Sequence, residues 1–145
     1  MRKPLLVIMC FSAVVLVAFQ AIGPYGRAYT IEATVDIKPD TINLNREGRW
    51  ITAYVTLPEG YNVSDFDLST ILLEGIFRPE WSNIEDDQLM VKFDSAPVMD
   101  YLWDRLYHMG GSREYLELTV SGQLTNGMDF VGSDTVAIMD PPPGQ

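Results

Sequence analysis

Hydrophobic and polar residues alternate along most of the chain after residue 29, a period of two that is typical of β-strands with one buried face. The first run, Ile31–Ile37, places aliphatic side chains at every second position, with Glu, Thr and Asp between them. Further apolar runs predict strands at Ile42–Leu44, Ile51–Leu57, Ile71–Leu73, Leu89–Asp94, Leu116–Leu124, Met128–Phe130 and Thr135–Met139. The pattern therefore predicts a mainly β domain.

Turn-forming residues and polar stretches divide these runs. Asp65–Thr70 is a polar connector with room for one helical turn, and Arg78–Asp87 is expected to be a loop. Asn126-Gly127 predicts a tight hairpin with positive φ at both residues. Gly132-Ser133 predicts a bulge or a turn in the last β region.

One segment has helical rather than strand periodicity. Its apolar residues recur three and four positions apart and predict one amphipathic helix over about 96–109. Asp94 or Ser95 can cap the N-terminus of this helix, and Gly110-Gly111 can end it. Short strands at regular spacing with one crossing helix are typical of an immunoglobulin-like Greek-key β-sandwich. The chain has no Cys–Trp–Cys pattern, so an antibody-type domain is not expected.

The N-terminus has the layout of a secretory signal. Arg2 and Lys3 precede the apolar run Leu5–Phe19, and Gly26–Ala28 supplies the small residues that a signal peptidase reads. We therefore expect a signal peptide over 1–28. An uncleaved N-terminal anchor is the alternative, because the apolar segment reaches the length of a membrane-spanning helix. Either interpretation predicts that the rest of the chain is secreted or held at the extracellular cell surface.

The exported part is expected to be a single domain over 29–140, followed by a Pro-rich tail over 141–145. It keeps seven basic and 20 acidic residues, a net charge of −13, because no acidic residue precedes Glu32. Such a charge excludes nucleic acid and anionic membrane surfaces as partners of the domain. The only cysteine is Cys10, within the predicted signal, so the domain has no disulfide and no thiolate metal site.

The order and spacing of eight segments add a further observation: Val35–Pro39, Ile42–Leu44, Trp50–Pro58, Val63–Asp67, Ser69–Leu73, Met90–Asp94, Leu118–Leu124 and Gly132–Val136. In this respect the chain resembles a module of exported archaeal and bacterial cell-surface proteins. The resemblance implies a β-sandwich unit with an accessory or structural role. It also implies an acidic D-x-D-G-D-G loop, similar to a calcium loop, before the strand Leu89–Asp94. Here that place holds Asn83–Gln88, which lacks the glycines and the alternating acids.

Acidic side chains are the candidate ligands for a metal ion. Glu85, Asp86 and Asp87 form the densest acidic cluster, and Asp65 and Asp67 precede it in another connector. Calcium takes about six to eight oxygen ligands, which these residues could supply in part. A solvated acidic loop is the alternative, since three adjacent carboxylates cannot all face one ion. Calcium is the only cofactor that the sequence suggests.

Aromatic residues and one sequon suggest a second kind of site. Tyr61 and Trp81 lie in predicted loops, where a core does not explain them, and are candidates to stack on sugar rings. Asn62, in the sequence Asn-Val-Ser, is a candidate acceptor of N-linked glycan. These residues favour a glycan-binding module as the alternative to a purely structural one.

Catalytic motifs are not evident in the sequence. His108 is the only histidine, and no G-x-S-x-G elbow accompanies it. Asp100 and Asp104 share a face of the predicted helix, where solvent exposure and pairing of Asp104 with His108 explain them. We therefore expect a protein that is not an enzyme, an accessory or structural module that interacts with an unidentified protein or cell-surface component.

Overall fold

The computed structural model describes residues 29–45, 48–109 and 112–140. The predicted signal, the predicted helix end at Gly110-Gly111 and the Pro-rich tail lie outside these residues. The described strands are β1 (Thr30–Glu32), β2 (Thr34–Lys38), β3 (Thr41–Asn43), β4 (Trp50–Thr56), β5 (Phe66–Leu73), β6 (Trp81–Glu85), β7 (Gln88–Asp94), β8 (Arg113–Leu124) and β9 (Asp129–Met139). A 3-10 helix, η1 (Val63–Asp65), precedes β5, and an α-helix, α2 (Ser95–Met109), links β7 to β8.

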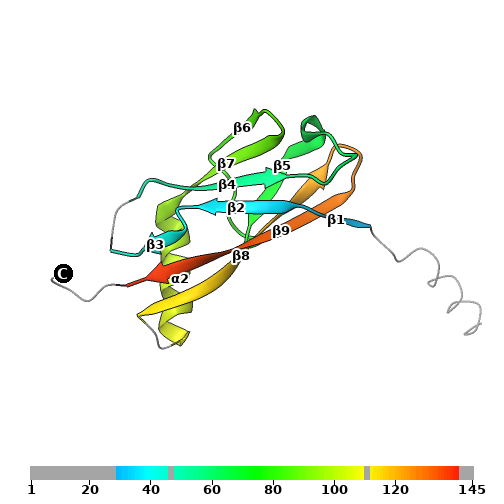
Figure 1. The fold of residues 1–145 in the computed structure, drawn as a ribbon. Helices are drawn as coiled ribbons and strands as arrows, with labels where there is room; N and C mark the ends of the chain where they lie inside the picture. Colours follow the sequence, from blue (N-terminus) through cyan, green and yellow to red (C-terminus); the bar gives the residue numbers. More distant parts are fainter. Residues whose placement is uncertain (1–28, 46–47, 110–111, 141–145) are drawn as a thin grey trace, which may run out of the picture.

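The strands form two sheets, which confirms the mainly β fold (Figure 1). One sheet has the order β1-β9-β8-β5, and β3 also pairs with β9. The other has the order β2-β4-β7-β6. β1 and β3 run parallel to β9, and the remaining neighbours are antiparallel.

A single apolar cluster joins the two sheets and the helix. Its largest fully buried side chains include Ile37 and Phe93 from one sheet, Phe130 from the other, and Leu102 from α2. Ser95 is the one buried polar residue among the described residues. Burial of these side chains, and not a covalent link, therefore holds the described domain together.

The chain passes from one sheet to the other at Ala33, so the predicted strand Ile31–Ile37 is in fact two strands. β1 pairs with β9, whereas β2 pairs with β4. The Ala33 N–H donates to the Val131 carbonyl at 2.8 Å, so β2 starts close against β9. Gly132 on β9 permits this approach, because a Cβ there would lie 2.6 Å from Val35 Cγ2 and would also clash with the Ala33 carbonyl.

Two segments that were predicted to be connectors are strands. Phe66–Leu73 forms β5, and the short helical turn lies before it, at Val63–Asp65. A register shift between Asp67 and Leu72 breaks the alternation that identifies a strand in sequence. The predicted loop Arg78–Asp87 contains β6, whose residues are almost all exposed and so carry no apolar pattern.

The predicted hairpin at Asn126-Gly127 is confirmed, with a different turn. The Leu124 N–H donates to the Met128 carbonyl at 2.8 Å, and only Gly127 has a positive φ, of 85°. This is a three-residue loop with glycine in the left-handed position. The expected interruption at Gly132-Ser133 is wrong, since β9 runs through both residues, with Gly132 paired to Val120.

The predicted helix is confirmed over Ser95–Met109. Asp94 caps it, because its Oδ1 accepts the Ala96 N–H at 3.1 Å. Val98, Leu102 and Leu106 lie on one face, one turn apart, and are buried in the core. The helix thus closes the core as it carries the chain from β7 to β8 (Figure 1).

We predict that Gly132→Ala destabilises the protein by about 2–3 kcal/mol, because the added methyl group would force β2 away from β9. Thermal or denaturant unfolding measures the change. Gly48→Ala is the matched control, since a Cβ at Gly48 meets no atom within 4 Å. Equal stability of the Gly132→Ala variant and the wild type would show that the crossing has more space than its geometry indicates.

Candidate functional site

The outer face of the β2-β4-β7-β6 sheet presents three aromatic side chains. Trp50 and Tyr54 on β4 alternate with buried Ile51, Ala53 and Val55, so they point away from the core. Trp81 on β6 is 43% exposed. The register places Thr52 opposite Lys92 and Lys92 opposite Trp81, which brings these side chains to one face. We call Trp50, Thr52, Tyr54, Trp81, Asn83 and Lys92 the aromatic face.

Regular strand geometry sets the spacing of the three rings. Trp50 and Tyr54 are four residues apart on one strand, so their Cα atoms are about 13 Å apart. Trp81 lies two strands away from β4, about 10 Å across the sheet. Polar Thr52 and Lys92 stand between the rings. The face therefore combines aromatic surface with hydrogen-bonding groups, and Met90 lies on it between Tyr54 and Asn83.

A cation lies against two of these rings. The Arg49 guanidinium is 5.1 Å from the centre of the Trp50 ring, and Lys92 Nζ is 5.1 Å from the centre of the Trp81 ring. Such contacts contribute about 0.5–1 kcal/mol each at exposed sites. They favour a fixed orientation of both indole rings, and the two cations share this face with Asp36 on β2 and Asp94 on β7.

The structure separates the two aromatic residues that the sequence singled out. Tyr61, 37% exposed, follows β4 and lines a pocket of about 560 Å³ together with Asn62 and Asp87. That pocket lies at the turn end of the β6–β7 hairpin, whereas Trp81 begins β6 at the other end. The aromatic neighbours of Trp81 on its face are Trp50 and Tyr54, which sequence reasoning did not single out. The alternation along β4, with Trp and Tyr at its polar positions, is the signal for them.

Asn62 is exposed and acts as the N-cap of η1. Its Oδ1 accepts the Ser64 N–H at 2.9 Å and the Ser64 hydroxyl at 2.8 Å. The two polar residues of the sequon thus lie in contact at the surface. Glycosylation of Asn62 remains a prediction.

The five acidic residues proposed for calcium lie in two places. Glu85 ends β6, and Asp86 and Asp87 form the β6–β7 turn, where Asp86 has a φ of 50°. Asp65 ends η1, and Asp67 Oδ1 accepts both the N–H and the hydroxyl of Ser69. Two of the five make local hydrogen bonds: Asp67 with Ser69, and Glu85, whose Oε1 accepts the Asn83 amide at 3.3 Å. Within residues 29–45, 48–109 and 112–140, no group of three or more His, Cys, Asp or Glu residues could hold a metal ion.

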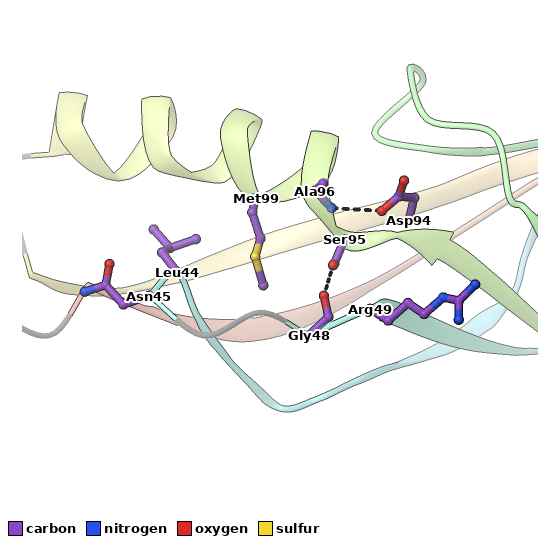
Figure 2. A pocket seen from close by; sticks show the side chains of 8 residues that line it. All are labelled: Leu44, Asn45, Gly48, Arg49, Asp94, Ser95, Ala96 and Met99. Carbon is purple, nitrogen blue, oxygen red and sulfur yellow. Dashed lines mark hydrogen bonds between the residues drawn. The ribbon is translucent and has the colours of Figure 1, made fainter.

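A pocket of about 710 Å³ opens at the N-terminus of α2 (Figure 2). Met99 and Leu44 give it an apolar side, and Asp94 occupies the helix end by capping Ala96. The Ser95 hydroxyl donates to the Gly48 carbonyl and ties the chain before β4 to the helix. Asp94 and Ser95 are thus engaged in fixing the start of α2, while the Asn45 amide donates to Asp140 and Arg49 lies on the Trp50 ring.

Glu74 links α2 to the β5–β8 pair. Its Oε1 accepts the Thr119 N–H at 2.6 Å and its Oε2 accepts the Tyr101 hydroxyl at 3.0 Å. Burial, and next the hydrogen bond to Glu74, raise the pKa of Tyr101 above its usual value, although Arg105 opposes them. Lys38 also has a raised pKa, because its ammonium donates to Asp40 and lies 3.3 Å from Asp36.

Asp104 on α2 pairs with His108 at the helix surface, as the sequence predicts. His108 Nδ1 lies 3.6 Å from the Asp104 carboxylate and 2.7 Å from the Asp104 carbonyl oxygen. Both side chains are exposed, 71% and 75%. This pair stabilises the last turn of α2, where a protonated His also interacts favourably with the helix dipole.

Comparison with known proteins assigns no family to the chain. No protein-family model matches it, and a search of curated proteins finds no significant match. The resemblance to an exported surface module therefore stays a prediction. Among the described residues, no helix has the length and hydropathy needed to cross a bilayer.

We predict that saturating calcium leaves the thermal unfolding midpoint of the protein unchanged relative to a chelating buffer. An ion that binds only the native state must raise the unfolding midpoint. We expect no such rise, because the five candidate carboxylates are divided between two places in the structure. A saturable rise that Asp87→Asn abolishes, and Asp100→Asn does not, would instead establish a calcium site at the β6–β7 turn.

A second prediction concerns alkaline pH. Because the pKa of Tyr101 is higher in the folded state, the unfolded chain loses this proton first. Its contribution to stability is complete below about pH 10 and is lost as pH rises toward the folded-state pKa. In Tyr101→Phe, the free energy of unfolding should therefore fall less between about pH 8.5 and pH 11 than in the wild type. Tyr115→Phe, at a tyrosine that is 66% exposed, should keep the wild-type pH dependence. If the free energy of unfolding depended on pH in the same way in both variants, Tyr101 would not be the group responsible.

Proposed function

We propose that the protein is a non-catalytic accessory module, secreted or held at the cell surface, that works by presenting its outer surfaces to a partner. The aromatic face carries this proposal. Large aromatic side chains are enriched where proteins bind partners, and here three of them share the outer side of one sheet. The N-terminal segment supports export, since its charged start, apolar run and small residues are those of a secretory signal.

The order of the strands supports an immunoglobulin-like Greek-key β-sandwich for this module. One sheet follows β2-β4-β7-β6, and the other contains β5-β8-β9. Constant-type immunoglobulin domains divide four strands and three in this way, and here β1 and β3 extend the second sheet along β9. Such modules present faces and loops on a rigid core, which fits a role in binding.

The engagement of the titratable groups supports a non-catalytic role. Asp94 caps a helix, Asp67 holds a turn, and Glu74 ties two elements together. The aromatic face, by contrast, offers exposed stacking surface, and its structural contacts are local ones, such as the hydrogen bond from the Asn83 amide to Glu85 Oε1 at 3.3 Å. It is the part of the described surface that we expect a partner to recognise.

A glycan is the second candidate for the partner. Sugar rings have apolar faces that stack on aromatic side chains and hydroxyls that need hydrogen bonds. Trp81 and Tyr54 supply rings, and Asn83, Thr52 and Lys92 supply polar groups on the same face. This juxtaposition favours an extended polysaccharide over a small sugar, because the rings are spread over about 10–13 Å.

The test is binding of the purified exported protein to isolated cell envelopes and to a panel of soluble polysaccharides. We expect Trp81→Ala to weaken binding by about tenfold, as the loss of an aromatic contact of 1–2 kcal/mol would. Tyr115→Ala is the matched control, because Tyr115 is also exposed and also has a cation near its ring, Arg113 at 5.8 Å, but lies on the other sheet. If the two variants weakened binding equally, the aromatic face would not be the binding surface. Protease-treated envelopes that still bind would identify a glycan as the partner.

A further inference from the structure

Sheet edges expose unpaired backbone groups, and the protein covers most of its edges. β1 and β3 pair with β9 along its two ends, and β2 covers the stretch between them. There the Ala33 N–H donates to the Val131 carbonyl, and the Ile37 N–H donates to the Asp134 carboxylate at 2.8 Å. Backbone groups at the outer edges of β9 and β2 are thus hydrogen-bonded to each other's strand or its side chains.

The edge of β5 is covered by the chain that follows it. Phe77 returns alongside Leu73, whose N–H donates to the Phe77 carbonyl at 2.9 Å. Arg78 Nη1 donates to the Ser69 carbonyl at 3.3 Å. The register shift between Asp67 and Leu72 makes this edge irregular as well.

β6 is different, because it pairs with β7 on one side and with no described strand on the other. Natural proteins protect such an edge with charged side chains, Pro or a bulge. Trp81–Glu85 contains no Pro and no bulge, and its one charged residue, Glu85, stands at the end of the strand. Ile84 is opposite Leu89, which is completely buried, yet Ile84 itself is 40% exposed. Both the backbone and the apolar side chain of this edge are therefore available to another strand.

We propose that β6 pairs antiparallel with β6 of a second copy of this chain, around a two-fold axis at Asn83. This inference rests on the proposed function and gives it a partner. The pairing is self-complementary: Asn83 faces its equivalent, Ser82 faces Ile84 of the second copy, and Trp81 faces Glu85 of the second copy. It joins two four-stranded sheets into one of eight strands and makes the two aromatic faces continuous.

Charge complementarity favours the second copy over an unrelated strand. Lys92 Nζ lies 5.1 Å from the Trp81 ring centre, on the side of the sheet where Glu85 of the second copy arrives. Of the described residues, no carboxylate lies within 4.0 Å of Lys92 Nζ. The two-fold axis makes this contact twice, with each Lys92 facing one Glu85.

The net charge of each copy opposes association and predicts how salt acts on it. Two exported domains of −13 each repel over the Debye length, which is about 10 Å at 0.1 M salt and 3 Å at 1 M. The backbone hydrogen bonds of the strand pairing are not screened in this way, and the two Lys92–Glu85 contacts, which salt weakens, are small beside the repulsion of the two net charges. We therefore expect the dimer to be stronger at high salt.

The test is sedimentation velocity and light scattering on the purified exported protein at increasing concentration and salt. We expect a dimer that Ile84→Lys weakens by about tenfold or more, because it places two like charges at the strand edge. Ile76→Lys is the matched control, since Ile76 is more exposed but lies off this edge. Its dimer should match the wild type. A protein that stays monomeric throughout, or a dimer that Ile84→Lys leaves intact, would overturn the proposal.

Charge reversal tests the register and avoids loss of folding as an explanation. Glu85→Lys and Lys92→Glu should each weaken the dimer, and the double variant should restore it to within about threefold of wild type, as charge pairing predicts. Failure of the restoration in a folded double variant would exclude this register. Binding to cell envelopes separates the two proposals. If the Ile84→Lys variant is monomeric and still binds envelopes, the dimer is not needed for binding and the proposed function stands. If the Tyr54→Ala variant still forms the dimer and binds envelopes as well as the wild type does, only the proposed function is contradicted.

Discussion

The close crossing of β2 over β9 is the contact on which the arrangement of the two sheets depends. Gly132 lets the backbone at Ala33 approach, and the Ala33–Val131 hydrogen bond holds it there. Because the chain changes sheets at this point, β1 extends one sheet while β2 begins the other. Both sheets then bury aliphatic side chains in one cluster. The stability of the domain depends on this cluster, because the only cysteine of the sequence is Cys10 and no disulfide can form within the domain.

The helix completes this core and leaves the outer surfaces free. Asp94 and Ser95 fix its start against the chain before β4, and Glu74 holds its side through Tyr101. Its charged residues, such as Asp104 and His108, face solvent. The outer side of the β2-β4-β7-β6 sheet is consequently not covered by the described helix. The aromatic face and the open edge at β6 belong to this same sheet, so our proposals for a surface partner and for a second copy involve adjoining surfaces.

The local hydrophobic pattern was sufficient to predict an element wherever a strand or helix has one buried face. The alternation over Ile51–Leu57 and Leu116–Leu124 and the helical spacing over 96–109 gave the correct elements, since burial of one face leaves that period in the sequence. β6 was missed because an exposed edge strand has no apolar face. β5 was missed in part because its register shift breaks the period.

The sequence by itself determined the mainly β class, the amphipathic helix, the charge of the domain and the residue types available for binding, because these follow from composition and from periodicity along the chain. It could not show that Trp81 shares a face with Trp50 and Tyr54 rather than with Tyr61, or that β6 has a free edge. Those facts depend on which strands pair and in which register. Tertiary structure alone decided them, because pairing is set by contacts between residues far apart in the chain and by close approaches such as that at Gly132.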